Sequence, residues 1–208
     1  MTGQEDLVVL VADADAELTL KTLLEERAFD LGIRPVCYRI IREPMHDAGV
    51  FQNAHNILRL YIHQASYALT ILDREGSGRE KKWSADQIEE DVEKRLRGNG
   101  WTDAEGQSRA AAIVLDPELE VWVWSRSPHV AEVLGLTGDE LQQILNSCEL
   151  AENGKPKHPK ETMLTALRLS RRPMSASIFQ ELARRVSLQS QERAFDKLRK
   201  TLQKWFPV

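Results

Sequence analysis

The chain has 208 residues, of which 42% are hydrophobic and 29% are charged. It is long enough to bury one sizeable core and too apolar to be disordered throughout. It contains no run of about 18 apolar residues, so we predict no transmembrane helix and no membrane partner. The first fifteen residues lack the basic start and the cleavage site of a signal peptide. The two cysteines, Cys37 and Cys148, exclude a disulfide scaffold or a cysteine-based zinc site and predict a reducing, cytoplasmic location.

The net charge of −4 conceals two regions of opposite charge. Residues 1–150 hold 15 Lys and Arg against 27 Asp and Glu, a formal charge of −12. Residues 151–208 hold 13 Lys and Arg against 5 Asp and Glu, a formal charge of +8. This asymmetry predicts an acidic working region and a basic docking region. The alternative is that the basic region is a solvated helical surface, or one that neutralises the acidic region.

Four short apolar runs are typical of buried parallel strands, because they are rich in Val, Leu, Ile and Ala and are bounded by polar residues. Three of the four end in a carboxylate. The predicted strands are 6–13, 34–41, 67–73 and 110–116.

Segments with helical spacing of apolar residues separate and follow these strands. Ser84 and Ser127 are predicted N-caps, and the Gly-containing segments 43–49 and 74–79 are predicted loops. The predicted helices are 16–28, 50–64, 84–98, 117–124, 128–136, 139–150, 160–170, 175–186 and 191–205.

Strands alternate with helices over residues 6–124, and the predicted strands stop after about residue 137. This order predicts an α/β fold, a parallel sheet flanked by helices, with a helical C-terminal extension. We therefore predict an α/β domain over 1–136 and a basic helical extension over 137–208. Residues 153–159, with one Gly and two Pro, form the best candidate linker.

Acidic residues follow three of the predicted strands. Because the carboxyl ends of parallel strands share one edge of the sheet, where ligands bind at a switch point, these side chains are expected to converge. Such oxygen donors suit Mg²⁺ or Mn²⁺, and two ions can clamp a phosphodiester. The alternative is that they are helix caps and solvated acids. The predicted metal ligands are Asp13, Asp15, Asp73, Glu75, Asp116 and Glu118.

Asp73 and Glu75 form the sharpest pair, because Gly76 and Gly78 allow a tight turn near a phosphate. Together with Asp13 they are the predicted catalytic residues, one of which would act as general base on a metal-activated water. His46 lies in a predicted loop that could face the same edge and would serve there as a base or a ligand, with a solvated side chain as the alternative.

Basic residues of the C-terminal region are candidates for phosphate contacts. Arg168 and Arg172 are four residues apart and are expected to share one helical face with Arg171. The predicted nucleic-acid-binding residues are Arg168, Arg171, Arg172, Arg184 and Arg185. Among the tryptophans, Trp101, Trp122 and Trp124 favour packing in the core, with base stacking as the alternative.

Two motifs are similar to those of a known family. ILDREGSG, containing Asp73-Arg74-Glu75, resembles the Asp-x-Asp motif of the Toprim domain of topoisomerases, primases and OLD-type nucleases. DPELEVW is similar to the Pro-Glu-x-x-x-Trp stretch of small stand-alone Toprim-like proteins from bacterial defence islands, including methylation-associated phage defence. The family's Glu-Gly after its first strand is Ala12-Asp13 here, which leaves the position of its general acid–base open.

This resemblance covers about residues 6–124 and implies Mg²⁺-dependent hydrolysis of nucleic-acid phosphodiesters in antiviral defence. The implied partners are nucleic acid and other defence-system proteins. The alternative is a non-catalytic subunit of a defence complex that binds nucleic acid or protein through a degenerate site. A receiver domain of two-component signalling is a rival resemblance, with Asp73 as phosphoacceptor. A receiver domain carries a Lys after its last strand, and this chain has none there. The gap from Asp15 to Asp73 is also long for that fold.

Overall fold

The computed structural model describes residues 5–125, 127–188 and 192–208. Over these residues the chain forms a four-stranded, all-parallel sheet with the strand order β2-β1-β3-β4. The predicted α/β fold, with a parallel sheet, flanking helices and a helical C-terminal extension, is confirmed. The strands are β1 (Glu5–Val11), β2 (Tyr38–Arg42), β3 (Ala65–Asp73) and β4 (Ala110–Leu115).

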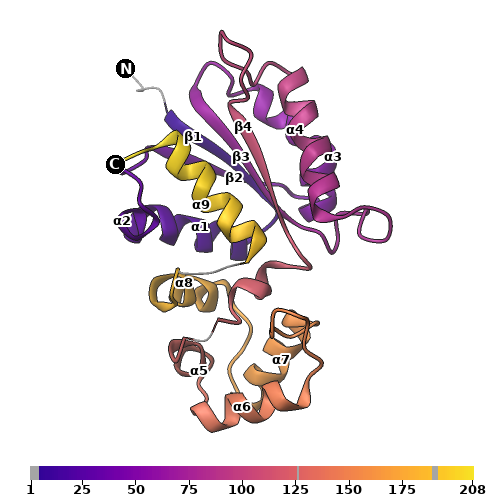
Figure 1. The fold of residues 1–208 in the computed structure, drawn as a ribbon, viewed down its shortest axis with the longest axis vertical. Helices are drawn as coiled ribbons and strands as arrows, with labels where there is room; N and C mark the ends of the chain where they lie inside the picture. The colour runs from indigo at the N-terminus through magenta and orange to yellow at the C-terminus, as the bar shows by residue number, and fades with distance from the viewer. Residues whose placement is uncertain (1–4, 126, 189–191) are drawn as a thin grey trace.

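Helices cover both faces of the sheet (Figure 1). Side chains alternate along a strand, so Leu7 and Val9 pack in the cluster formed with α1 and α9, while Val8 and Leu10 pack in the cluster formed with α3 and α4. Both faces of β1 are therefore buried, as its unbroken apolar run predicts. These helices are α1 (Ala14–Glu26), α3 (His46–Arg59), α4 (Ala85–Gly98) and α9 (Arg193–Trp205).

The strand order creates a switch point between β1 and β3. The connection from β1 to β2 runs through α1 and the short α2 (Ala28–Leu31) on one face, whereas α3 leads from β2 to β3 on the other. Ligands of open α/β sheets bind outside the carboxyl ends of the strands at such a point. Asp13 follows β1 and Asp73 ends β3, so both lie beside it.

Polar caps explain where the helices begin. Asp13 has extended backbone angles, and its Oδ1 accepts a hydrogen bond from the backbone N–H of Ala16 at 2.9 Å. The predicted cap at Ser84 is confirmed, and Gln87 completes a capping box there. The predicted cap at Ser127 is wrong, because Pro128 itself is the N-cap of the next helix.

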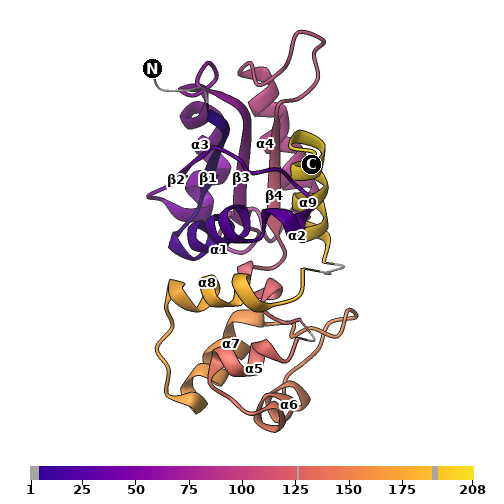
Figure 2. The same ribbon diagram turned by 90° about the vertical axis from the view of Figure 1, so that its left-hand side faces the viewer.

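The remaining helices lie mostly on one side of the carboxyl edge. In both views α8 lies along α1, with α5, α6 and α7 farther from the sheet (Figures 1 and 2). After α8 the chain returns to the sheet, where α9 covers β4. These elements are the 3₁₀ helix η1 (Leu119–Trp122), α5 (His129–Leu134), α6 (Gly138–Ser147), α7 (Pro159–Ser170) and α8 (Ala176–Arg185).

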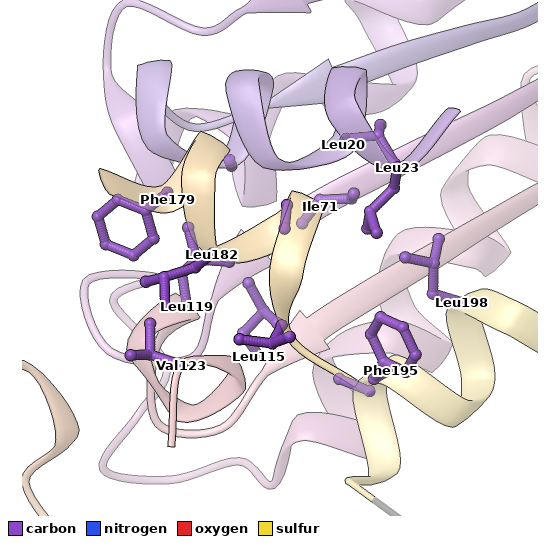
Figure 3. Packing of buried hydrophobic residues seen from close by; sticks show 14 of the residues in the cluster. Leu20, Leu23, Ile71, Leu115, Leu119, Val123, Phe179, Leu182, Phe195 and Leu198 are labelled. Carbon is purple, nitrogen blue, oxygen red and sulfur yellow. The ribbon is translucent and has the colours of Figure 1, made fainter. Parts of the chain in front are cut away.

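The core of the C-terminal region is continuous with that of the sheet. Phe179 and Leu182 of α8 belong to the same hydrophobic cluster as Leu23 of α1, and Phe195 of α9 lies near Leu115 of β4 (Figure 3). Burying such side chains contributes about 1.5–3 kcal/mol each. The last two helices are thus held by the same hydrophobic cluster as the sheet.

A network of ion pairs joins α4 to α9 and β4; we call Glu89, Glu93, Arg193 and Lys197 the α4–α9 network. Oε2 of Glu89 accepts hydrogen bonds from Arg193 and Lys197, both at 2.9 Å, and its Oε1 accepts from the backbone N–H of Val114 at 2.8 Å. Lys197 also donates to Glu93 at 2.8 Å. Both carboxylates of this network, Glu89 and Glu93, therefore have a cationic partner.

Three predicted elements differ from the structure. Helix α3 begins at His46, inside the predicted loop 43–49. Gly49 suggested a loop, but it allows close packing within the helix, since a Cβ there would lie 2.5 Å from Cγ of Glu43. The predicted helix 117–124 is the short η1, and predicted strand 34–41 is displaced to β2. Among the described residues, no helix is both long and apolar enough to span a membrane.

Candidate functional site

Acidic side chains from several connections meet at the carboxyl edge of the sheet, and we call them the carboxylate cluster. Two lie at the start of α1, one in the first turn of α3, one at the end of β3 and two at η1. The charges of several members raise the pKa of others. The cluster consists of Asp13, Asp15, Asp47, Asp73, Glu118 and Glu120.

Asp47 fixes the end of β3. Its Oδ1 accepts a hydrogen bond from the backbone N–H of Asp73 at 2.7 Å. The loop after β3 passes close to the same carboxylate: a Cβ at Gly76 would lie 3.4 Å from Oδ2 of Asp47, and Gly76 has a φ of 83°. Glycine is therefore required for its backbone angle and permits the close approach.

Ionisation of Asp73 and Asp47 is unfavourable where they lie. Burial raises the pKa of Asp73 well above its ordinary value, and the charges of Asp47, Glu120, Asp13 and Glu118 raise it further. Burial also raises the pKa of Asp47, with a contribution from Asp13, although the hydrogen bond from Asp73 opposes the shift. These groups therefore hold protons more tightly than isolated carboxylates do, and nearby positive charge would favour their ionised forms.

The two glutamates of η1 share one lysine. Burial raises the pKa of Glu120 to about 7, Lys160 opposes the shift, and Glu118 and Asp15 add to it. Nζ of Lys160 lies 3.8 Å from Oε1 of Glu120 and 4.0 Å from Oε2 of Glu118. Glu120 is only 3% exposed, whereas the Lys160 side chain is 52% exposed. One accessible ammonium group therefore faces two carboxylates.

The structure brings together most, but not all, of the predicted metal ligands. Asp13, Asp15, Asp73 and Glu118 belong to the carboxylate cluster. Glu75 is exposed at its border, where its charge raises the pKa of Glu118. Asp116 is exposed and forms an ion pair with Nε of Arg74 at 2.8 Å. Its carboxylate thus already has a cationic partner.

Asp47, Glu120 and Lys160 were not among the predicted site residues. Asp47 lies in the segment predicted as a loop, and its neighbour His46 is exposed and lowers the pKa of that aspartate. Glu120 stands two residues after Glu118, a spacing that signals nothing by itself. Lys160 lies far along the chain among other basic residues, so only the fold can place it at this edge.

Several of the predicted phosphate-binding arginines form ion pairs or hydrogen bonds within the folded chain. Arg184 forms a two-pronged ion pair with Glu26, at 2.7–2.9 Å, and Arg185 pairs with acids of α5 and α8. The prediction that Arg168, Arg171 and Arg172 share one helical face is wrong. Helix α7 ends at Ser170, and the left-handed backbone conformation of Arg171, with a φ of 56°, changes the direction of the chain. Arg172 then donates to the carbonyl of Val133 at 2.6 Å. Arg168 is exposed on α7.

The tryptophans are mainly packing residues. Trp101 and Trp124 are buried, and Nε1 of Trp124 donates to the carbonyl of Pro159 at 3.0 Å. Trp122 donates to Glu192 at 2.6 Å and packs edge-to-face with Phe195. A cavity of about 690 Å³ beside η1 and α8 is lined by Trp122 and Trp124. Among its described lining residues there is no member of the carboxylate cluster.

The donors of the carboxylate cluster suit a hard divalent cation, which prefers carboxylate oxygens. Burial raises the pKa of Asp73 and Glu120, and neighbouring carboxylates raise both further, so a bound cation would favour the ionised forms of these groups. Within residues 5–125, 127–188 and 192–208, however, no three His, Cys, Asp or Glu side chains are spaced to hold a metal ion. The donor chemistry fits, and binding would require the carboxylates to draw together.

Fold and site together define an α/β protein with an acidic cluster at the switch point of a parallel sheet. Comparisons with protein-family models, with curated proteins and with solved structures gave no match.

Proposed function

We propose that the carboxylate cluster binds Mg²⁺ or Mn²⁺ and hydrolyses phosphodiester bonds in nucleic acid. The observation that carries the proposal is the convergence of acids from separate connections around Asp73, whose pKa burial and neighbouring charges raise well above its ordinary value. Unlike the α4–α9 network, this cluster has far more acidic than basic groups. A divalent ion would offset that excess and let a phosphate approach.

We assign the proposed role of each residue from its position in the carboxylate cluster. Asp13, Asp47 and Asp73 would hold the ion, because they lie at the switch point between β1 and β3. When bound, the ion would polarise a phosphoryl oxygen and acidify a water. Glu120 would accept the proton of the attacking water, since a pKa of about 7 suits a general base near neutral pH.

The wider setting depends on the resemblance of ILDREGSG and DPELEVW to Toprim-like proteins of bacterial defence systems. It supports nucleic acid as substrate and other defence proteins as partners. The formal charge of +8 on residues 151–208 supports a role in attracting phosphate. Arg168 is the best candidate among the five predicted arginines, because it is exposed on the side of α7 while Arg184 and Arg185 pair with acids.

Hydrolysis can be tested with end-labelled single-stranded DNA, double-stranded DNA and RNA, each incubated with Mg²⁺ or Mn²⁺. We expect cleavage by the native chain, loss of cleavage in Asp73→Asn, and a reduced rate with an altered pH profile in Glu120→Gln. Glu90→Gln is the matched control, because Glu90 is an exposed acid on α4. Cleavage that persists in Asp73→Asn, or that needs no divalent ion, would contradict the proposal.

A second candidate function is a non-catalytic subunit that binds nucleic acid or a protein partner. The observation that favours it is the spacing of the acids, since no three of them among the described residues are close enough together to hold a metal ion. Titration with Mn²⁺ separates the two candidates, because only the hydrolase requires the carboxylate cluster to bind it. Nucleic-acid binding without Mn²⁺ binding would favour the subunit.

A further inference from the structure

We infer that the cavity beside η1 and α8 binds a small aromatic monocarboxylate, with the ring against the apolar wall and the carboxylate on Lys155. This is the cavity lined by Trp122 and Trp124, and we call it the η1–α8 cavity. Its described lining residues include no member of the carboxylate cluster. The inference therefore goes beyond the proposed function and does not depend on it.

The wall of the η1–α8 cavity is mainly apolar and aromatic. Its volume of about 690 Å³ falls within the roughly 300–1,000 Å³ of small-molecule sites. The wall includes Leu23 of α1, Leu119 of η1, Leu182 of α8 and Phe195 of α9, all labelled in Figure 3. These side chains belong to the main hydrophobic cluster, so the packing of the core also fixes the shape of the cavity.

The tryptophans and the glutamate on this wall already have hydrogen-bond partners. Nε1 of Trp124 donates to a backbone carbonyl at 3.0 Å, and Nε1 of Trp122 donates to Oε2 of Glu192 at 2.6 Å. Glu192 also accepts the backbone N–H of Phe195 at 2.8 Å, as the N-cap of α9. Water in the cavity finds few partners among these groups, so an aromatic ring that displaces it gains contacts with the wall.

Lys155 supplies the polar contact of the proposed site. Its Nζ donates to the backbone carbonyl of Val121 at 2.7 Å, which uses one of the three N–H donors of an ammonium group. Among the described lining residues it is the only Lys or Arg, and its Nζ forms no ion pair with any described carboxylate. Two N–H donors are therefore left for the oxygens of a ligand carboxylate.

The charges on the wall favour a ligand with a single negative charge. Burial lowers the pKa of Lys155, and the charge of Glu192 opposes that shift. A bound carboxylate would favour the charged form of the lysine, whereas Glu192 would repel a second negative charge. An aromatic body suits the remaining space, because Trp122 and Phe195 already pack edge-to-face with ring centroids 5.3 Å apart.

Two probes of the same shape and different charge test the inference. The full chain is titrated by calorimetry, without divalent ions, with 2-naphthoate and with its neutral analogue 2-naphthamide. We expect the native chain to bind naphthoate about tenfold more tightly or better, because a carboxylate forms charge-assisted hydrogen bonds with Lys155. Lys155→Met should lose this preference and still bind naphthamide, since the apolar wall is kept.

Matched variants separate the role of Lys155 from general effects of charge and folding. Lys157→Met removes a neighbouring cation that pairs with Glu149, and it should keep the preference for naphthoate. Ser127→Phe adds a ring at the wall of the cavity and should weaken the binding of both probes about tenfold or more. The melting temperature of each variant shows that it is folded.

The outcomes are decisive for the η1–α8 cavity alone. Equal affinity of the native chain for the two probes, or a preference for naphthoate that persists in Lys155→Met, would overturn the inference. Failure of the native chain to bind either probe would overturn it as well. None of these results bears on the proposed function, because the titrations contain no divalent ion and the variants leave the carboxylate cluster unchanged.

Discussion

Glu89 on α4 and Glu120 in η1 are buried to nearly the same extent, at 4% and 3% exposed, yet their surroundings are opposite. Glu89 accepts hydrogen bonds from Arg193 and Lys197 at 2.9 Å and from the backbone of Val114 at 2.8 Å. Glu120 lies among other acids, with one ammonium group 3.8 Å away. The first environment neutralises its carboxylate and the second leaves negative charge in excess.

Burial alone therefore does not distinguish a functional acid from a structural one. In the α4–α9 network the acids are matched by cations and backbone donors, which is how a fold retains buried charge. In the carboxylate cluster the acids outnumber the cations; burial raises the pKa of Asp73 and Glu120, and neighbouring carboxylates raise both further. An uncompensated excess costs stability, and such perturbed groups concentrate at functional sites.

The largest effect is expected at Glu89. Glu89→Ala leaves Arg193 with one carboxylate fewer and Val114 without its hydrogen-bond acceptor, so we expect the free energy of unfolding to fall by about 3–5 kcal/mol. Urea denaturation measures the loss, with exposed Glu90→Ala as the control. A loss below about 1 kcal/mol would place the α4–α9 network among weak surface pairs.

The next effect is a gain of stability at Glu120. Its pKa of about 7 in the folded chain, against an ordinary 4.5, means that the folded state binds more protons between these values. The contribution of Glu120 therefore becomes unfavourable as the pH rises from about 4.5 to 7, by about 3 kcal/mol in total. Glu120→Gln should remove this fall, measured by urea denaturation across that range without divalent ions. Parallel pH curves for the two chains would contradict the assignment.

A divalent ion should stabilise the folded chain by binding at the carboxylate cluster and not at the α4–α9 network. At 100 times its dissociation constant, Mg²⁺ or Mn²⁺ should stabilise the native chain by about 2.7 kcal/mol, seen as a rise in melting temperature. Asp73→Asn should lose most of that rise, whereas Glu93→Gln in the α4–α9 network should keep it. Equal rises in the native and Asp73→Asn chains would mean that the ion binds elsewhere.

The smallest effect on stability is expected at Arg168. Because its side chain is exposed, Arg168→Glu should change the free energy of unfolding by no more than about 0.5 kcal/mol. It should still weaken binding to nucleic acid and reduce the dependence of affinity on salt by about one phosphate contact or more. Gel shifts over a salt series measure this, with Lys94→Glu on α4 as the control. Identical salt slopes in all three chains would remove Arg168 from the binding surface.

Local signals predicted much of the sheet and part of the site. The apolar runs identified β1, β3 and β4, and Asp13 and Asp73 follow from the rule that parallel strands end at one edge. The start of α3 was missed because Gly49 is also a common loop residue. Its real function, close packing against Glu43, depends on a contact that only the folded chain makes.

Contacts between distant segments explain the rest. Arg184 pairs with Glu26, 158 residues away, so its charge in the sequence says nothing of its availability to phosphate. Lys160 reaches the carboxyl edge because Trp124 and Glu118 hold the first turn of α7. Sequence spacing predicts which residues lie at the end of a strand, but not which cation the rest of the chain brings to them.

The outer edge of β4 has one further consequence. Glu93 and Glu89 accept the backbone N–H groups of Ala112 and Val114 at 3.1 and 2.8 Å, and Arg193 donates to the Val114 carbonyl at 2.5 Å. These side chains occupy the positions that the backbone of an additional strand would take. A second molecule therefore cannot extend the sheet here by edge-to-edge pairing, and the α4–α9 network protects the protein against aggregation along β4.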